Sequence, residues 1–385
     1  MSKLSLGGDM AEHRARRAAA FLAGVSTFED GVENGDALEA MTAPPATEPV
    51  TGFAQLADGD KRAVEGAMAK LLSPEAMDDA EADALEAIIL PDKRPVIDIL
   101  SDDYVAQEND WLFLNSQAAR ASIVPAIPAI GRLDLPDHPF LPYAGTAFVV
   151  GSDLLMTNRH VAEIVATGLG RSLAFKPDIT SRINFAAEAT RPGDTSFVVD
   201  EAVLIHPYWD MALLRVRGLD PKIQPLRFAR DPAVVDRGAD VAVIGYPAYD
   251  PTRNDIEVQR RVFRNLFNVK RLQPGKLVTR KGVRSFGKMV EAFTHDSCTL
   301  GGDSGAAVID VATGLVAALH FGGRYLEANY AVPACDMALD DRLVDFGLLF
   351  ETDGPPRPKP GPWDDYWRQT EEAEAPKPQG GCRGV

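Results

Sequence analysis

Residues 301–310 read Gly-Gly-Asp-Ser-Gly-Ala-Ala-Val-Ile-Asp, a glycine-rich turn around one serine that leads into a short apolar strand. Glycines allow such a turn to be tight and let several backbone N–H groups point the same way. A serine hydroxyl is a poor nucleophile unless a base removes its proton and N–H donors receive the oxyanion it creates. Ser304 is therefore the candidate nucleophile, with the N–H groups of Gly302 and Ser304 as candidate oxyanion donors. Taken alone, such a turn also occurs by chance.

A candidate base lies upstream, at the end of a predicted β-hairpin. The apolar runs Gly145–Val150 and Leu154–Thr157 are separated by a Gly-Ser-Asp turn, and His160 follows the second run. A strand, rather than a helix, follows the Ser304 turn, which differs from the nucleophile elbow of α/β-hydrolases. An isolated histidine is usually structural, so His160 gains meaning only together with the other motifs.

A third motif, His206–Val216, places Asp210 directly before the apolar run Met211–Val216. A carboxylate that enters a core needs a hydrogen-bond donor, and a histidine N–H would serve. The chain order His160, Asp210, Ser304 is that of the base, orienting carboxylate and nucleophile in one arrangement of the catalytic triad. The three motifs together therefore predict acyl transfer.

The segment 144–350 consists mainly of short apolar runs separated by turn signals, which indicates an all-β barrel or sandwich. No alternation with long helices is present, which argues against a doubly wound sheet. The expected strands include Ala147–Val150, Leu154–Thr157, Ala202–Ile205, Met211–Val216, Val241–Ile244, Ala306–Ile309 and Leu315–Phe321.

These motifs together resemble those of the bacterial trypsin-like serine peptidases. Thr157–Ala162, Asp210–Leu214 and Gly302–Gly305 are similar to the family's histidine, aspartate and serine motifs, and Val243–Pro247 to the entry of its second barrel. The resemblance covers residues 125–345 and implies a mainly β, chymotrypsin-like double six-stranded β-barrel. It also implies a serine endopeptidase that hydrolyses peptide bonds through an acyl-enzyme, with a protein or peptide as substrate and no cofactor.

The expected substrate pocket is most similar to that of the glutamyl endopeptidases. In that family a threonine and a histidine bind an acidic side chain, which implies a pocket of Thr299, His320 and Gly322 here. A hydroxyl and a potentially charged imidazole suit a carboxylate chemically. The departure is one extra residue between Ser304 and His320. Asp296 lies farther before the serine than the pocket carboxylate of trypsin does.

Asp303 raises the question of activation. In trypsin-like zymogens the aspartate at this place pairs with a new N-terminus made by cleavage, and Arg120–Val124 precedes the barrels at a plausible distance. A buried carboxylate would equally pair with a nearby arginine. Proteolytic activation and a direct side-chain partner are therefore both open.

The flanks divide the chain further. We expect a flexible N-terminal arm at 1–52, a helical hairpin extension at 53–94, a connecting segment at 95–130 and the protease domain at 131–350. The hairpin is expected to dock on the body or on a partner. One helix is predicted over Pro333–Phe346. A proline-rich, acidic and mostly disordered tail at 351–385 carries Trp363, Tyr366 and Trp367, which are available to dock.

Composition limits partners and compartment. The chain has 385 residues and a net charge of −16, which disfavours nucleic acid and anionic membrane surfaces. Its three cysteines, Cys298, Cys335 and Cys382, favour a reducing, cytoplasmic compartment, although a Cys298–Cys335 bridge stays open. Met1–Phe28 resembles a secretory signal only weakly. No stretch reaches the ~20 apolar residues that span a bilayer.

Two other functions compete with the peptidase. A catalytically silent protease-fold module for binding would keep the barrels without the activity, but all three triad positions and the glycine turn are present. A metal hydrolase is disfavoured because His160, His206 and His320 lie in different motifs without metal-ligand spacing. We expect no metal site.

Overall fold

The structure is a computed structural model that describes residues 94–138, 141–192, 195–249, 256–324, 328–351 and 358–374. The predicted arm at 1–52, nearly all of the helical hairpin at 53–94 and the signal-like start Met1–Phe28 lie outside the described residues. Partner docking on that hairpin is therefore untested. Cys382 and the tail end at 375–385 are outside as well.

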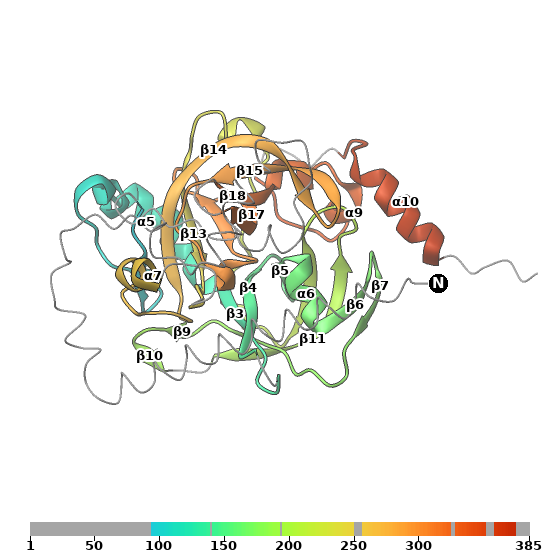
Figure 1. Ribbon diagram of the computed structural model, residues 1–385, viewed down its shortest axis with the longest axis horizontal. Helices are drawn as coiled ribbons and strands as arrows, with labels where there is room; N and C mark the ends of the chain where they lie inside the picture. The colour runs from blue at the N-terminus through green and yellow to red at the C-terminus, as the bar shows by residue number, and fades with distance from the viewer. Residues whose placement is uncertain are drawn as a thin grey trace, which may run out of the picture.

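The first barrel is closed and has six antiparallel strands in the order β11-β12-β5-β4-β3-β8 (Figure 1). Its β5 is buried along its whole length, and β4 almost so, because the barrel core covers one face and neighbouring elements cover the other. The strands are β3 Ile130–Asp134, β4 Tyr143–Val149, β5 Leu154–Thr157, β8 Arg182–Asn184, β11 Ser196–Ile205 and β12 Ala212–Arg217. The ends of β5 and β12 place His160 and Asp210 side by side, since Ala212 pairs with Thr157.

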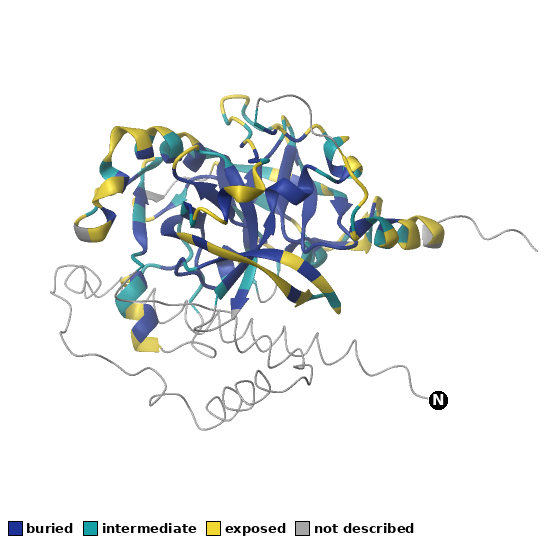
Figure 2. Ribbon diagram, turned by 90° about the horizontal axis from the view of Figure 1, so that it is seen from above, coloured by how far each residue is buried: buried dark blue, intermediate teal, exposed yellow. Residues whose placement is uncertain are grey.

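The second barrel also has six strands. Its order is β13-β16-β17-β18-β15-β14, and the pairing of β13 with β14 completes the ring. The strands are β13 Asp240–Gly245, β14 Arg271–Ser285, β15 Lys288–His295, β16 Ala307–Asp310, β17 Val316–Arg324 and β18 Ala328–Pro333. The mainly β, chymotrypsin-like double barrel is thereby confirmed, and buried strands fill the centre of the molecule in Figure 2.

Shorter elements surround the barrels. Strands β1 and β2 extend the second sheet beyond β14, and two hairpins, β6–β7 and β9–β10, lie beside the first. The strands are β1 Ile97–Leu100, β2 Asp103–Tyr104, β6 Ala166–Leu169, β7 Ser172–Phe175, β9 Ala187–Glu188 and β10 Arg191–Pro192. Among the described residues, the helices before the last strand are η2 Asn109–Asn115, α5 Gln117–Ile123, η3 Val124–Ala129, α6 Arg159–Val165, η4 Pro232–Val234, α7 Ile256–Phe263 and η5 Gly301–Asp303.

The C-terminal part corrects two sequence predictions. The single helix expected over Pro333–Phe346 is two short helices, α8 Ala334–Met337 and α9 Asp341–Val344, because the Asp340 side chain accepts from Arg342 N–H and caps α9. The prediction of a mostly disordered tail at 351–385 is wrong for the part that forms α10, Trp363–Glu374. Burial of Trp363 and Trp367 confirms that its aromatic residues dock.

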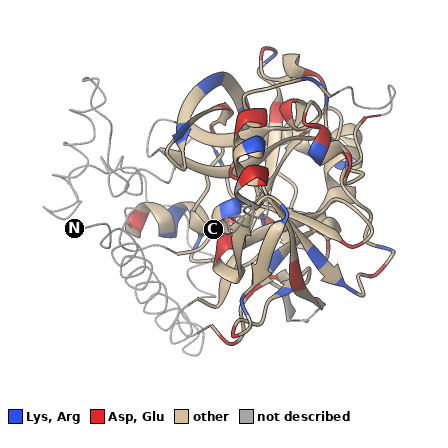
Figure 3. Cartoon of the chain, turned by 90° about the vertical axis from the view of Figure 1, so that its right-hand side faces the viewer, with Lys and Arg blue, Asp and Glu red and all other residues tan. Residues whose placement is uncertain are grey.

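Two further expectations concern membranes and cysteines. Within the residues that the structure describes, no helix is long and apolar enough to cross a membrane. Cys298 and Cys335 are buried and no disulfide joins them. Acidic and basic residues are interspersed on the face that carries α10 (Figure 3).

Candidate active site

His160 and Asp210 meet at the edge of the first barrel. His160 is the second residue of α6, and its Nδ1 lies 2.7 Å from Asp210 Oδ2. The His160 backbone N–H donates to the other carboxylate oxygen, Oδ1, at 3.0 Å. Asp210 is 5% exposed, whereas a third of the His160 side chain is exposed. The carboxylate is thus held in the core while one edge of the imidazole faces outward.

Asn158 fixes the backbone on the other side of this pair. Its side-chain amide donates to the Asp210 carbonyl at 2.9 Å, and its own carbonyl accepts from Ala162 N–H at the start of α6. One buried asparagine therefore links the segments that carry the imidazole and the carboxylate. Sequence reasoning missed this role, although Asn158 stands two residues before His160.

The turn that carries Ser304 is anchored on the first barrel through its backbone. Thr146 N–H donates to the Ser304 carbonyl at 2.8 Å. A Cβ on Gly305 would lie 2.0 Å from the Thr146 carbonyl and 2.5 Å from the Thr157 hydroxyl, so only glycine fits there; its φ of +89° is also left-handed. A Cβ on Gly145 would likewise lie 2.8 Å from the Ser304 carbonyl and 3.1 Å from the Val161 side chain. The predicted nucleophile is therefore brought to the ends of β4 and β5, next to the start of α6.

Gly302 sits between the two barrels. A Cβ on it would lie 2.0 Å from the Tyr246 carbonyl and 2.4 Å from the Tyr143 hydroxyl, and its own carbonyl accepts from the Thr146 hydroxyl at 2.9 Å. The Ser304 N–H, a predicted oxyanion donor, faces the Gly301 carbonyl across η5 at 3.5 Å. This long contact is weak, so the N–H can exchange it for a substrate oxygen.

Asp303 is fully buried behind the nucleophile. Its two oxygens accept from Leu300 N–H and from the Gln273 side-chain amide, both at 2.8 Å. Burial raises the pKa of the Asp303 carboxyl to about 7, and those two hydrogen bonds and Arg271 only partly oppose the rise. The side-chain partner of Asp303 is therefore the Gln273 amide rather than the arginine considered from sequence. Arg120, at the expected cleavage position, lies within α5 and pairs with Asp103 at 2.5 Å.

The predicted pocket residues lie along one side of this turn. Gly305 N–H donates to the His320 carbonyl and His320 N–H to the Ala306 carbonyl, so β17 runs beside the nucleophile. A Cβ on Gly322 would meet nothing within 4 Å, so Gly322 borders open space. The Thr299 hydroxyl is buried and donates to Asn329 Oδ1 at 2.8 Å.

A second histidine, which sequence reasoning did not single out, completes this region. His295 Nε2 lies 3.1 Å from His320 Nδ1. Burial, with the nearby His320 as a smaller cause, holds the pKa of His295 well below its ordinary value, so this imidazole is neutral. Asp296, which trypsin-like specificity would place in the pocket, instead bonds to Arg94 Nε at 2.9 Å. Among the described residues, no group of three or more His, Cys, Asp or Glu could hold a metal ion.

Comparison with known proteins agrees with this geometry. Residues 145–319 match the family described as "Trypsin-like peptidase domain". A probable serine protease of Lysobacter enzymogenes is 28% identical over 286 residues, which cover 66% of this chain and 74% of that protein. These two similarities support a trypsin-like serine peptidase.

Two solved structures are similar to parts of the chain. The active form of the Rv3671c protease from M. tuberculosis is 24% identical, with 68% of this chain and 96% of that chain covered and a TM-score of 0.42. The HtrA-type protease AlgW with a decapeptide is 16% identical, with 60% and 67% covered and a TM-score of 0.38.

Proposed function

We propose that this chain is a trypsin-like serine endopeptidase in which His160, Asp210 and Ser304 form the catalytic triad. The observation that carries the proposal is the 2.7 Å contact between His160 Nδ1 and Asp210 Oδ2 at the place where the Ser304 turn docks. Asp210 accepts a hydrogen bond from the Nδ1–H of His160, which leaves Nε2 as the basic nitrogen. The imidazole then has the tautomer that a general base for a serine hydroxyl requires.

The reaction proceeds by acyl transfer in two steps. His160 Nε2 takes the Ser304 proton while Oγ forms a bond to the substrate carbonyl carbon, and the peptide C–N bond breaks as the same proton passes to the leaving amine. Water then repeats the sequence on the acyl-enzyme and restores the serine. The Gly302 and Ser304 N–H groups would stabilise the oxyanion, and Ser304 N–H would leave its long contact with Gly301 to do so.

A fluorophosphonate probe tests this function against the silent binding module. The wild type should be labelled and should cleave a protein substrate, whereas Ser304→Ala should do neither and should unfold at the same temperature as the wild type. A wild-type protein that is folded but neither labelled nor active would favour the silent module.

The pocket supports a preference for an acidic residue before the scissile bond. His320 can place a positive charge beside Ser304, because His295 Nε2 can accept a hydrogen bond from the Nδ1–H of His320 while Nε2 of His320 is also protonated. The Thr299 hydroxyl donates to Asn329 in the neighbouring strand β18, and the Asn329 amide in turn donates to the Ser297 carbonyl at 2.6 Å. Peptides that differ only before the cleaved bond should be cut after Glu or Asp. Cleavage after Arg or Lys but not Glu would reject this preference.

Proteolytic activation stays a separate proposal. Arg120 lies in α5, and Ile123 at its end is 0% exposed, so cleavage would require this helix to open first. Mass spectrometry of the purified protein over time would reveal a cut at Arg120. If Arg120→Gln leaves both chain length and activity unchanged, cleavage there has no part in activation.

A further inference from the structure

Helix α10 packs against the turn that leads into Asp210. Trp363 and Trp367, on one face of the helix, are 5% and 2% exposed. The Trp363 ring lies 4.8 Å from that of Trp209, and the Trp367 ring lies edge-on to His206 at 5.0 Å. Trp209 is the residue directly before Asp210, so the far C-terminal helix contacts the neighbour of the proposed triad carboxylate.

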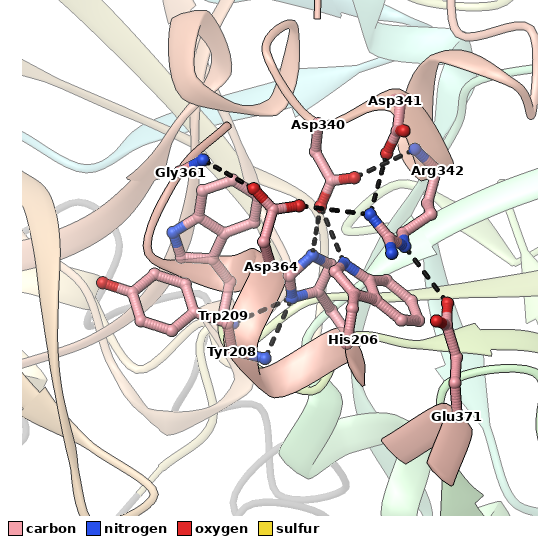
Figure 4. Close-up of polar contacts among 10 residues, drawn as sticks. His206, Tyr208, Trp209, Asp340, Asp341, Arg342, Gly361, Asp364 and Glu371 are labelled. Atoms are coloured by element: carbon pink, nitrogen blue, oxygen red, sulfur yellow. Dashed lines mark hydrogen bonds and ion pairs between the residues drawn. The ribbon is translucent and has the colours of Figure 1, made fainter. Parts of the chain in front are cut away.

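His206 connects the helix to the backbone of the same turn (Figure 4). Its Nδ1 accepts from the N–H groups of Tyr208 and Trp209, at 3.1 and 3.0 Å, and its Nε2 lies 3.0 Å from Asp340 Oδ2. Burial lowers the pKa of His206 below its ordinary value despite the opposing effect of Asp340, so the ring is neutral and its one proton is on Nε2. The imidazole thus fixes two consecutive peptide N–H groups just before Asp210.

Asp340 joins this histidine to α10. The same Oδ2 atom accepts from Trp367 Nε1 at 2.9 Å, and Oδ1 accepts from Arg342 N–H. Burial alone would raise the pKa of the Asp340 carboxyl, but the hydrogen bonds from His206 and Trp367 bring it below its ordinary value. Arg342 adds links to Asp364 and Glu371 on α10, at 3.2 and 3.3 Å. One carboxylate therefore accepts a hydrogen bond from His206, at the start of the turn 206–210, and another from Trp367 of the C-terminal helix.

The β14–β15 hairpin holds the turn from another side. The Tyr208 hydroxyl donates to the Met289 carbonyl at 3.1 Å, and Lys288 donates to the Pro207 carbonyl. Lys288 also lies 4.7 Å from the Tyr366 ring of α10, and Tyr366 contacts Tyr208 at 5.2 Å. The turn 206–210 is therefore enclosed between the hairpin and α10.

We propose that α10 is a positioning element of the active site: Trp367, through Asp340 and His206, keeps the turn 206–210 in the conformation that presents Asp210 to His160. The proposal rests on the proposed triad. Asp210 contacts His160 with both oxygens, at 2.7 and 3.0 Å, so a shift of its backbone by about 1 Å would break both contacts. His206, Asp340 and Trp367 act through Asp210 and do not touch substrate.

The experiment compares variants of the full chain by the rate at which a fluorophosphonate labels Ser304 and by kcat and KM for a cleaved peptide. Trp367→Ala should lower the labelling rate and kcat at least tenfold and leave KM within about twofold, because ground-state binding does not use Asp210. Trp367→Phe, which keeps most of the ring packing but loses the Nε1–H donor to Asp340, should recover only part of the rate. Arg368→Ala, on the exposed side of α10, should match the wild type.

A double-mutant cycle separates positioning from general destabilisation. In the Asp210→Ala background, Trp367→Ala should change the labelling rate by less than twofold, because the group that it positions is gone. An equal loss in both backgrounds, or a wild-type rate in Trp367→Ala alone, would overturn the proposal. If thermal unfolding shows that Trp367→Ala does not fold, the same cycle with Asp340→Asn decides, with the same two outcomes.

Failure of the proposed function has a different signature. In that case the wild type and Ser304→Ala would be labelled equally or not at all, whatever the state of α10. Failure of the positioning role alone would leave a wild type that is labelled at Ser304 and a Trp367→Ala variant that is labelled as fast.

Discussion

His160 and Asp210 come from the first barrel and are joined through side chains, whereas Ser304 comes from the second barrel and is held through its backbone. The first pair depends on one carboxylate with two short contacts, and Asn158 and His206 hold the backbone around it. The Ser304 turn depends on glycines that allow close packing and on Asp303 beneath them. The base side of the site, His160 and Asp210, should therefore be sensitive to the loss of charged and hydrogen-bonding groups. The nucleophile side, the Ser304 turn, should be sensitive to added volume and to buried charge.

The largest effect should come from Asp210→Asn on the base side. The amide would favour the opposite histidine tautomer, so kcat should fall by roughly 10⁴-fold while the fold is kept. Steady-state kinetics and thermal unfolding would measure both. Asp200→Asn, whose carboxylate pairs with Arg217 at the surface, is the control and should change neither. A loss below tenfold would mean that Asp210 does not orient the imidazole.

Asp303 offers a test of buried charge on the nucleophile side. Its pKa is about 7 in the folded protein, above the ordinary value of 3.8, so the folded state keeps a proton that the unfolded chain releases near pH 4. The contribution of Asp303 to stability should therefore be greatest below pH 4, fall as pH rises from 4 to 7, and level off above 7. A rise of this size corresponds to about 4 kcal/mol of unfolding free energy.

Asp303→Asn isolates that contribution from the other titrating groups. An asparagine can accept from Leu300 N–H and donate to Gln273 Oε1, a buried atom without a hydrogen-bond partner, once the Gln273 amide is turned over. Urea unfolding at several pH values should show the variant gaining on the wild type between pH 4 and 7. Parallel curves over that range would contradict a raised pKa.

Gly302→Ala tests the close packing of the turn. Because the new methyl group would lie 2.0 Å from the Tyr246 carbonyl, the turn must move, and the proposed oxyanion donors move with it. We expect kcat/KM to fall by roughly 10²-fold, about the effect of losing one oxyanion donor. Gly282→Ala, where the methyl group would meet only ordinary contacts at 3.4 Å, should leave kcat/KM unchanged. Equal activity in both variants would show that the turn tolerates volume.

The sequence was informative where a signal is local. Apolar runs bounded by turn residues predicted β4, β5, β11, β12, β13, β16 and β17, since burial on a pleated strand leaves a pattern within a few residues. The other barrel strands, β3, β8, β14, β15 and β18, were not among the named expectations. Residues around the predicted motifs were harder to find. Asn158, His295 and Asn329 act through hydrogen bonds to residues that are distant in the chain, and no spacing rule predicts such contacts.

The C-terminal region shows the same limit. The composition of 351–385, rich in proline and acidic residues, favours disorder. Two tryptophans of α10 nevertheless pack against residues 206–209 and 340. The predicted helix over Pro333–Phe346 failed because the Asp340 side chain competes for a backbone N–H and starts a new helix instead. Composition describes the tail by itself and cannot include the tertiary surface that stabilises it.

The smallest effect is expected in the predicted pocket, which strands β15 and β17 of the second barrel line beside the Ser304 turn. His295 Nδ1 is buried without a hydrogen-bond partner, so His295→Phe removes an unsatisfied polar atom and should cost little stability. The substitution also removes the acceptor for His320 Nδ1–H, so the protonated form of His320 would be less well stabilised. For paired peptides with Glu or Gln before the cleaved bond, kcat/KM should fall about tenfold for Glu and stay constant for Gln, as the loss of one charge-assisted hydrogen bond predicts. An equal fall for both peptides would assign His295 to packing of the barrel instead of recognition of charge.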